Sequence, residues 1–318
     1  MPRVGRVDTD RLFAGDRGAV ARAISLVENE APAAAELLAR VFPRTGRAYR
    51  IGVTGPPGAG KSTITNRLAH YYRAQGLTVG VIAVDPTSPF TGGALLGDRV
   101  RMTDVELDTG VFIRSMASRG SLGGLSRKAV EAADVLDAAG KDIVLFETVG
   151  VGQSELDIAG AADTTVVVLV PESGDSIQAM KAGLMEIADF FVLNKADRAG
   201  ADQAVTSIKT ILHFRDHAGW NPDVVKAVAS EGKGTAEVAA KVAEHRAWLE
   251  ADGRLAAKRR ARMGERVRHM AAERLGVDLW TPGRRVLLEG RLTEVMEQRV
   301  TPYEVVEEIL RDFRQEEP

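Results

Sequence analysis

The chain has 318 residues, with 42 lysines and arginines against 44 aspartates and glutamates, so its formal net charge is −2. This near-balance provides no overall attraction to nucleic acid or to a membrane surface. The absence of cysteine excludes disulfides, thiolate catalysis and cysteine-ligated metal sites.

The sequence shows neither a secretory leader nor an apolar run of membrane-spanning length. We therefore expect a cytoplasmic protein whose partners include neither nucleic acid nor membrane.

Residues 1–49 predict a helical extension that precedes the core. Asp16 is placed to cap a helix whose apolar positions include Val20 and Ile24, and a second helix is expected over about 32–42. Pro43 to Gly46 then ends this extension.

The segment Gly-Pro-Pro-Gly-Ala-Gly-Lys-Ser at 55–62 follows an expected strand at 50–54 and precedes an expected helix at 63–75. Strand, glycine-rich turn and helix are the context of a phosphate-binding loop, whose amides and helix start bind anions. Lys61 is expected to reach the β- and γ-phosphates, and the Ser62 hydroxyl to bind Mg²⁺. The predicted nucleotide-binding residues here are Gly55, Pro57, Gly58, Ala59, Gly60, Lys61, Ser62 and Thr63.

From residue 50 to about residue 229, short apolar runs alternate with helical patterns, which predicts an α/β domain, assigned to residues 50–250, with a mostly parallel central sheet. The phosphate loop makes this a P-loop NTPase. The expected strands contain residues 51–53, 79–84, 111–113, 143–146, 165–170, 190–193 and 224–228. Ligands of such sheets bind at the carboxyl ends of the strands.

Carboxylates follow several of these strands and predict a metal site. Glu147 stands where common GTPases have the aspartate of DxxG, and Asp85 and Asp98 are further candidates beside Ser62. Because Mg²⁺ usually recruits only one or two carboxylates, some of the three must act through water or in one state only. We expect Lys61, Asp98 and Glu147 to serve catalysis.

The turn after Glu147 bears on hydrolysis. Gly150 is expected to sense the γ-phosphate, but no glutamine follows it directly, the nearest being Gln153. The residue that orients water in small GTPases is thus displaced, which predicts slow hydrolysis that a partner stimulates.

Asn194-Lys195-Ala196-Asp197 follows the strand at 190–193 and matches the NKxD guanine reader. The Asp197 carboxylate can accept hydrogen bonds from guanine N1 and the exocyclic amine, whereas adenine offers neither; such a site can reject the wrong base about 10⁴-fold. Ala229 lies where GTPases have Ser-Ala, so its N–H is expected to meet guanine O6. Val228 replaces the usual serine.

Residues 251–318 predict a helical C-terminal extension. A basic helix is expected over 253–268, and Thr301-Pro302-Tyr303-Glu304 forms a capping box ahead of an apolar stripe. Such a terminal hairpin suits either a clamp over the core or a dimer surface.

The combined motifs resemble the MeaB/ArgK/MMAA family of P-loop GTPases. The matching segments are Gly55–Ser62, Asp85–Ser88, Glu147–Glu155, Gly174–Ile187 and Asn194–Asp197. The resemblance covers nearly the whole chain and implies GTP and GDP as ligands with Mg²⁺.

The resemblance also implies a partner, an adenosylcobalamin-dependent methylmalonyl-CoA mutase or a related mutase. Family members assist its cofactor loading, protection and reactivation, and they form homodimers through the C-terminal helices. The segment 171–181, with Asp175, Gln178 and Lys181, matches a switch that signals to the mutase.

Two other functions share the phosphate loop. A nickel-insertion GTPase generally holds metal with cysteine and histidine, whereas this chain has no cysteine and five scattered histidines. A small-molecule kinase usually binds ATP, against which the guanine reader argues.

Overall fold

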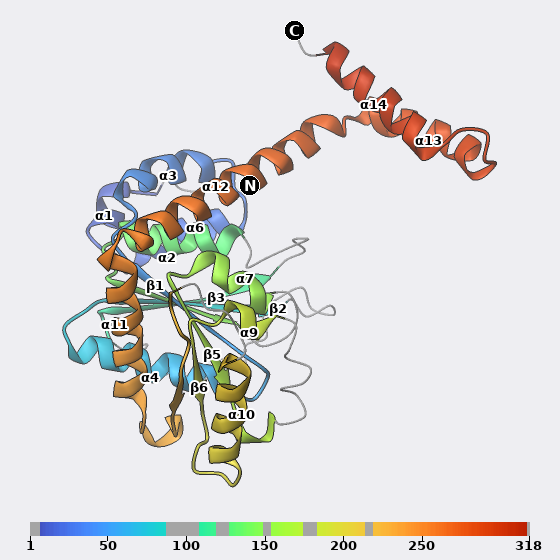
Figure 1. Cartoon of the computed structure of the whole chain (residues 1–318). Coiled ribbons are helices and arrows are strands. Elements are labelled where there is room, and N and C mark those ends of the chain that lie inside the picture. The colour runs from blue at the N-terminus through green and yellow to red at the C-terminus, as the bar shows by residue number, and fades with distance from the viewer. Residues whose placement is uncertain are drawn as a thin grey trace. The chain divides into compact units, whose positions relative to one another are not determined.

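The computed structural model describes residues 7–86, 108–118, 127–148, 154–173, 183–213 and 219–316. The chain forms two compact units, residues 1–256 and residues 257–318 (Figure 1). No helix within the described ranges combines the length and the apolar composition that crossing a bilayer requires.

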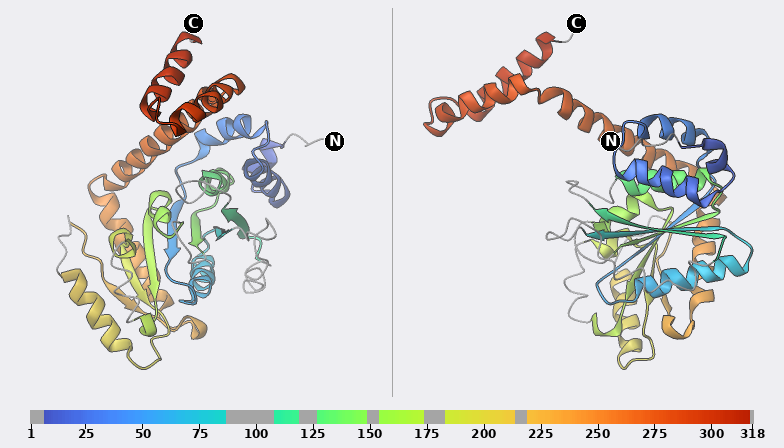
Figure 2. Two further views of the ribbon diagram at one scale, coloured as in Figure 1. Left: turned by 90° about the vertical axis from the view of Figure 1, so that its right-hand side faces the viewer. Right: turned by 180° about the vertical axis from the view of Figure 1, so that it is seen from behind.

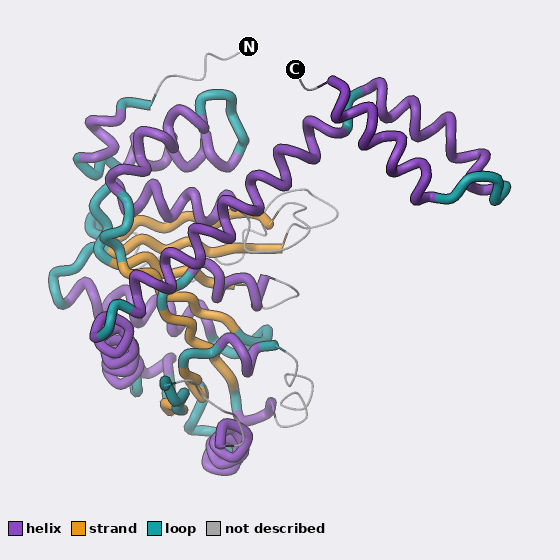
Figure 3. Tube along the Cα trace, turned by 45° about the horizontal axis from the view of Figure 1, so that its top comes forward, coloured by secondary structure: helices purple, strands orange, loops and turns teal. Residues whose placement is uncertain are grey.

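A seven-stranded sheet occupies the centre of the first unit in the order β3-β2-β4-β1-β5-β6-β7. Its neighbouring strands are all parallel across the described residues. Figure 3 shows the strands in orange, side by side between the helices. The strands are β1 (Tyr49–Thr54), β2 (Val79–Pro86), β3 (Val111–Ser118), β4 (Ile143–Thr148), β5 (Thr164–Leu169), β6 (Phe190–Leu193) and β7 (Val224–Lys226). The predicted α/β class and parallel sheet are confirmed.

Alternate residues of the strands face opposite helix layers, as period-two side chains must. Ile82 and Phe146 pack with the helices on one face, and Ile51 and Leu145 pack with those on the other. Figure 2 shows the N-terminal helices and α4 on opposite sides of the strands. The first layer contains α1 (Thr9–Phe13), α2 (Arg17–Glu28), α3 (Ala34–Val41), α6 (Arg127–Ala138) and α7 (Ser154–Ala161), and the second contains α4 (Lys61–Ala74) and α11 (Thr235–Ala251).

A third apolar cluster lies beside β5 and β6, where Val167 and Phe191 pack with two further helices. These are α9 (Leu184–Ile187) and α10 (Ala201–His213). Short 3₁₀ turns among the described residues of this unit are η1 (Phe42–Arg44), η3 (Pro171–Ser173) and η5 (Ala229–Glu231).

The N-terminal helices pack into the core of the first unit. Asp16 caps α2 by accepting the Ala19 N–H at 2.8 Å, as predicted. Where the chain enters β1, buried Arg50 pairs with Asp134 of α6 at 2.6 Å. Asp137, one turn further, accepts N–H groups of residues 46–48. These bonds hold the start of β1 against α6.

A buried polar chain lies where α11 meets the sheet. The Tyr49 hydroxyl and Thr164 Oγ1 lie 2.6 Å apart, and Thr164 Oγ1 lies 2.8 Å from His245 Nδ1. The His245 ring packs beside the rings of Trp220 and Trp248, with centroids 4.7 and 5.8 Å away. This cluster joins α11 to β1 and β5.

The second unit comprises most of α12 (Arg254–Leu279) with α13 (Pro282–Met296) and α14 (Pro302–Glu316). The predicted capping box is present, since the Thr301 N–H donates to Glu304 at 2.8 Å and the Glu304 N–H to Thr301 at 3.3 Å. Buried Arg284 joins α13 to α14 through Asp312 at 2.8 Å. The basic helix runs beyond the predicted residue 268, because residues 269–279 are mostly good helix formers.

Candidate functional site

The phosphate loop lies between the carboxyl end of β1 and the start of α4. Gly55 and Gly60 have φ values of +134° and +88°, which side chains rarely adopt. A Cβ atom would lie 2.1 Å from the Val168 carbonyl oxygen at position 55, and 2.3 Å from Asn194 Nδ2 at position 60. Glycine is therefore required at both positions by conformation and by space.

Lys61 is buried at the first position of α4. Its ammonium group donates to the carbonyl oxygens of Gly55 at 2.7 Å and Pro56 at 2.9 Å, so it lies across the loop. A phosphate is ionised, so its oxygens form stronger hydrogen bonds with an ammonium than neutral carbonyl oxygens do. The side chain is thus positioned for the predicted phosphate contact. The adjoining loop residues Pro57, Gly58, Ala59 and Thr63 lie in the same turn and first helical turn.

Ser62 and Glu147 meet beside the loop. Glu147 is 3% exposed near the end of β4 and pairs in register with Val53 of β1. The Ser62 hydroxyl donates to Glu147 Oε1. A hydroxyl and a carboxylate are the hard oxygen ligands that Mg²⁺ prefers, so this pair fits the ion.

Of the three carboxylates predicted to bind the metal, only Glu147 has a side chain among the described residues. Asp85 lies near the end of β2, although only its backbone is described. Asp98 and Gly150 lie outside the described residues. Within the described ranges, no three histidine, aspartate or glutamate side chains gather around a metal position.

Asn194 joins the predicted base reader to the phosphate loop. Its buried side chain donates to the Ala59 carbonyl at 2.8 Å and accepts the Ala229 N–H at 3.0 Å. Lys195 has a φ of +55° and donates to the Gly58 carbonyl at 2.8 Å. Three segments far apart in sequence therefore form one continuous site.

The Asp197 side chain, three residues after Asn194, is exposed to solvent, so a ligand can reach it. Nearby Lys233 has a raised pKa, chiefly because it is hydrogen-bonded to Glu231 and attracted by its charge, with Asp197 adding a smaller attraction.

The Ala229 amide bonds to another residue of the chain, and its contact with guanine O6 stays a prediction. The sequence predicts that this N–H donates to guanine O6. In the structure it donates to Asn194 Oδ1. Asn194 must share this donor for the amide to read a base. This hydrogen bond therefore fixes the turn formed by η5 (Ala229–Glu231), which is called the base-reading turn below.

Sequence reasoning missed Arg67 on α4. Its Nε atom donates to the Ala229 carbonyl at 2.9 Å, and Nη2 donates to the Ser230 carbonyl at 2.8 Å. The guanidinium thus holds both carbonyls of the turn that follows β7. No local pattern could reveal this contact, because the partners lie 162 and 163 positions away.

The start of the predicted switch segment also contacts this region. Glu172 in η3 forms an ion pair with Arg198, which follows the base reader directly. The Arg198 hydrogen bond lowers the pKa of Glu172. Asp175, Gln178 and Lys181 lie outside the described residues.

The chain is similar in sequence to proteins that are named GTPases. Residues 20–282 match the family model described as "Methylmalonyl Co-A mutase-associated GTPase MeaB". A protein of Pyrococcus abyssi named "Putative GTPase" is 48% identical over 308 residues, covering 96% of this chain and 95% of that protein. The GTPase ArgK of Escherichia coli is 39% identical over 274 residues, covering 83% and 82%.

A solved structure, that of a LAO/AO transport system kinase, superposes with a TM-score of 0.76 at 30% identity. The superposition covers 96% of both chains, so the fold match extends over nearly their whole length.

Proposed function

Because the chain belongs to the MeaB family of methylmalonyl-CoA mutase-associated GTPases, we propose that it is a GTP-driven chaperone for an adenosylcobalamin-dependent mutase. In this role it assists cofactor loading and the protection and reactivation of the mutase. GTP hydrolysis to GDP and phosphate is slow in the isolated protein and faster with the mutase bound.

The observation that carries the nucleotide part is the double contact of Asn194. One side chain bonds the phosphate loop at Ala59 and the base-reading turn at Ala229. A nucleotide whose phosphates lie on Lys61 would reach this turn with its base. Asp197 at the rim then selects guanine by accepting two hydrogen bonds that adenine cannot donate.

Mg²⁺ is a proposed cofactor that Ser62 and Glu147 would hold, directly or through water. When bound, the ion neutralises charge on the phosphates and orients them. Lys61 supplies a further positive charge to the same phosphates, and the amides at the start of α4 bind their oxygens. Asp85 and Asp98 remain proposed ligands, and Gly150 a proposed γ-phosphate contact.

The partner is proposed from the family and from the displaced glutamine. Without a glutamine directly after Gly150, water orientation requires help that a bound mutase could provide. Asp175, Gln178 and Lys181 are the proposed coupling residues, since they follow η3 near the base reader.

We further propose a cytoplasmic homodimer formed through the C-terminal extension 251–318. Within the second unit, Val286, Met296 and Tyr303 are 72%, 80% and 82% exposed. Covering such apolar side chains with a second copy removes them from water, which favours association. Sedimentation velocity tests this directly, and a monomer at micromolar concentration would contradict it.

The test of function is single-turnover GTP hydrolysis with and without a saturating adenosylcobalamin mutase, alongside capture of that mutase from lysate. We expect the mutase to accelerate hydrolysis and to be retained by the protein. If no such mutase changes the rate of GTP hydrolysis, the chaperone role is contradicted, whereas the proposed GTP hydrolysis itself is not.

A further inference from the structure

A cavity of about 470 Å³ opens at the amino ends of β1 and β4, the sheet edge opposite the phosphate loop. Its lining joins the end of α1, the chain before β1, the turn between α6 and β4, and α11. None of these residues takes part in the nucleotide site described above. The cavity lies wholly within the first unit.

The lining carries an excess of positive charge. Four cationic side chains, Arg44, Arg47, Lys141 and Arg246, face two carboxylates, Asp137 and Asp142. Four positive and two negative groups leave a formal charge of +2. Such a concave, cationic surface concentrates anions from solution.

Both carboxylates already bond to the surrounding fold. Asp137 accepts the N–H groups of Gly46, Arg47 and Ala48 at 2.7, 3.2 and 3.0 Å, and its side chain is fully buried. Asp142 accepts the N–H and hydroxyl of Thr78 at 2.7 and 2.8 Å. Neither forms an ion pair with Arg44, Arg47 or Arg246 among the described contacts.

Two arginines retain their hydrogen-bonding capacity. Among the described residues, no hydrogen bond or ion pair engages the guanidinium groups of Arg44 and Arg47, and both side chains are exposed. Arg44 is steadied by the Phe13 ring, whose centroid lies 4.0 Å away. Arg246 lies 4.8 Å from the centroid of the Tyr49 ring and donates to Glu250 at 2.8 Å. Stacking holds a guanidinium in place while its edge N–H groups stay available.

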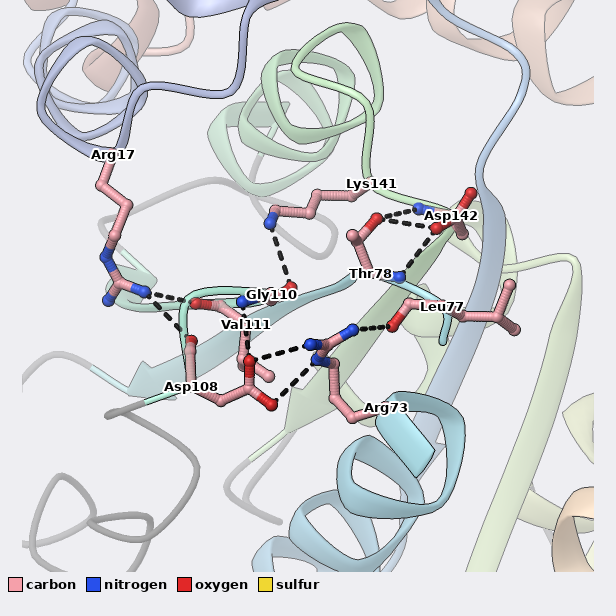
Figure 4. Close-up of polar contacts among 9 residues, drawn as sticks. All are labelled: Arg17, Arg73, Leu77, Thr78, Asp108, Gly110, Val111, Lys141 and Asp142. Atoms are coloured by element: carbon pink, nitrogen blue, oxygen red, sulfur yellow. Dashed lines mark hydrogen bonds and ion pairs between the residues drawn. The ribbon is translucent and has the colours of Figure 1, made fainter. Parts of the chain in front are cut away.

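The neighbouring cluster adds positive charge to the same edge. In Figure 4, Arg17, Arg73 and Lys141 converge on the turn Asp108–Val111, where Lys141 donates to the Gly110 carbonyl at 3.1 Å. The pKa of Lys141 is lowered, first by burial and then by repulsion from Arg17 and Arg73. An anion placed here would relieve this repulsion.

We propose that this cavity binds a small phosphate-bearing anion, independently of the guanine nucleotide. Guanidinium forks match phosphate oxygens in geometry, and the net charge at the cavity stays positive although Glu250, outside the lining, pairs with Arg246. Phe13, Leu77 and Ala138 provide an apolar wall for the organic part of a phosphate ester. The ligand would bridge the chain before β1 and the turn before β4.

The test is titration of inorganic phosphate into the full chain saturated with GDP and Mg²⁺, so that the phosphate loop is already filled. Ionic strength is held constant with chloride, and binding is followed calorimetrically. The cavity variant is Arg44→Gln with Arg47→Gln. The control is Arg22→Gln with Arg40→Gln, which makes the same charge change at exposed positions outside the cavity.

We expect saturable phosphate binding that the cavity variant weakens at least tenfold and the control changes less than twofold. Unchanged GDP affinity and melting temperature would show that both variants fold. Absence of saturable binding to the wild-type chain, or equal affinity in the cavity variant, would overturn the proposal. A parallel titration with glycerol 3-phosphate separates a preference for phosphate esters from one for free phosphate.

Discussion

At the residue scale, the base selectivity that we propose depends on Asp197, whose side chain is exposed to solvent. Asp197→Asn replaces an acceptor by a donor at the position facing base atom C2. Guanine N1–H then loses its partner, whereas xanthine, with oxygen at C2, gains one. We expect GTP affinity to fall by about 10²-fold or more and xanthosine triphosphate affinity to rise. Competitive titrations with both nucleotides measure the exchange, and an unchanged preference for GTP would remove Asp197 from the base site.

The phosphate side of the site gives a second residue-scale prediction. Lys61→Ala removes the charge proposed to lie against the phosphates, and Glu147→Gln keeps the shape but loses the charge beside Ser62. We expect hydrolysis to fall by about 10²-fold or more in each, with GDP affinity falling less. Single-turnover rates and GDP titrations separate the two effects. Equal losses of both, with a lowered melting temperature, would indicate misfolding instead.

Each motif of the site is local, so the sequence could predict the motif segments that the structure brings together, such as the phosphate loop and Asn194-Lys195. The glycines of the phosphate loop act through their backbone conformation, whereas Lys61 and Asn194 act through side-chain hydrogen bonds to backbone groups. The contacts of Ala229 and Arg67 were not predictable, since they depend on how β7 and α4 come together in space. A sequence pattern fixes neighbours along the chain, whereas these bonds join residues separated by 35 and 162 positions.

At the scale of elements, α4 connects the phosphate loop to the turn that follows β7. Its first residue belongs to the phosphate loop, and Arg67, nearly two turns later, holds the base-reading turn. A shift of α4 would therefore displace the phosphate contacts and η5 together.

This link predicts the behaviour of Arg67→Ala. The carbonyls of Ala229 and Ser230 lose their donors, and the turn loses its support from α4. We expect GTP and GDP affinities to fall by a similar factor of about tenfold, or about 1.4 kcal/mol. Arg73→Ala is the matched control, because Arg73 is on the same helix but bonds Asp108 and Leu77 instead. Unchanged nucleotide affinity in Arg67→Ala would show that Asn194 alone holds the turn.

The elements themselves were predictable from apolar periodicity and end signals. Asp16 and the Thr301–Glu304 box start their helices as expected. The end of α12 was not predictable, because Gly276 near its end did not stop the helix. The stripe expected along α14 is only partly buried, since Val305 is 3% exposed and Val306 52%. Periodicity locates an apolar face but not how much of it a neighbour covers.

At the scale of the whole molecule, the proposed function requires that the nucleotide state reach a second protein. A segment can report the γ-phosphate only if its contacts differ between the GTP and GDP states. We propose that the segment 171–181 has this role, and the Glu172–Arg198 pair ties its described start to the base reader.

Coupling is tested by Asp175→Ala and Lys181→Ala. Charged side chains can form ion pairs with either the GTPase core or the mutase. Removing them is therefore expected to break the link between the nucleotide state and the mutase. We expect basal GTP hydrolysis to stay within about threefold of the wild-type rate, while stimulation by a saturating mutase disappears. Turnover measured with and without mutase decides the matter. Variants stimulated as strongly as the wild-type chain would exclude this segment as the coupling element.

The placement of the tryptophans gives the molecule two separate optical reporters. Trp220 and Trp248 pack around His245 in the first unit, and Trp280, the remaining tryptophan of the sequence, belongs to the second. A Trp280→Phe chain would emit only from the cluster beside β5. Its fluorescence would then follow denaturation of the GTPase body alone, and the difference from the unaltered chain would follow the C-terminal helices.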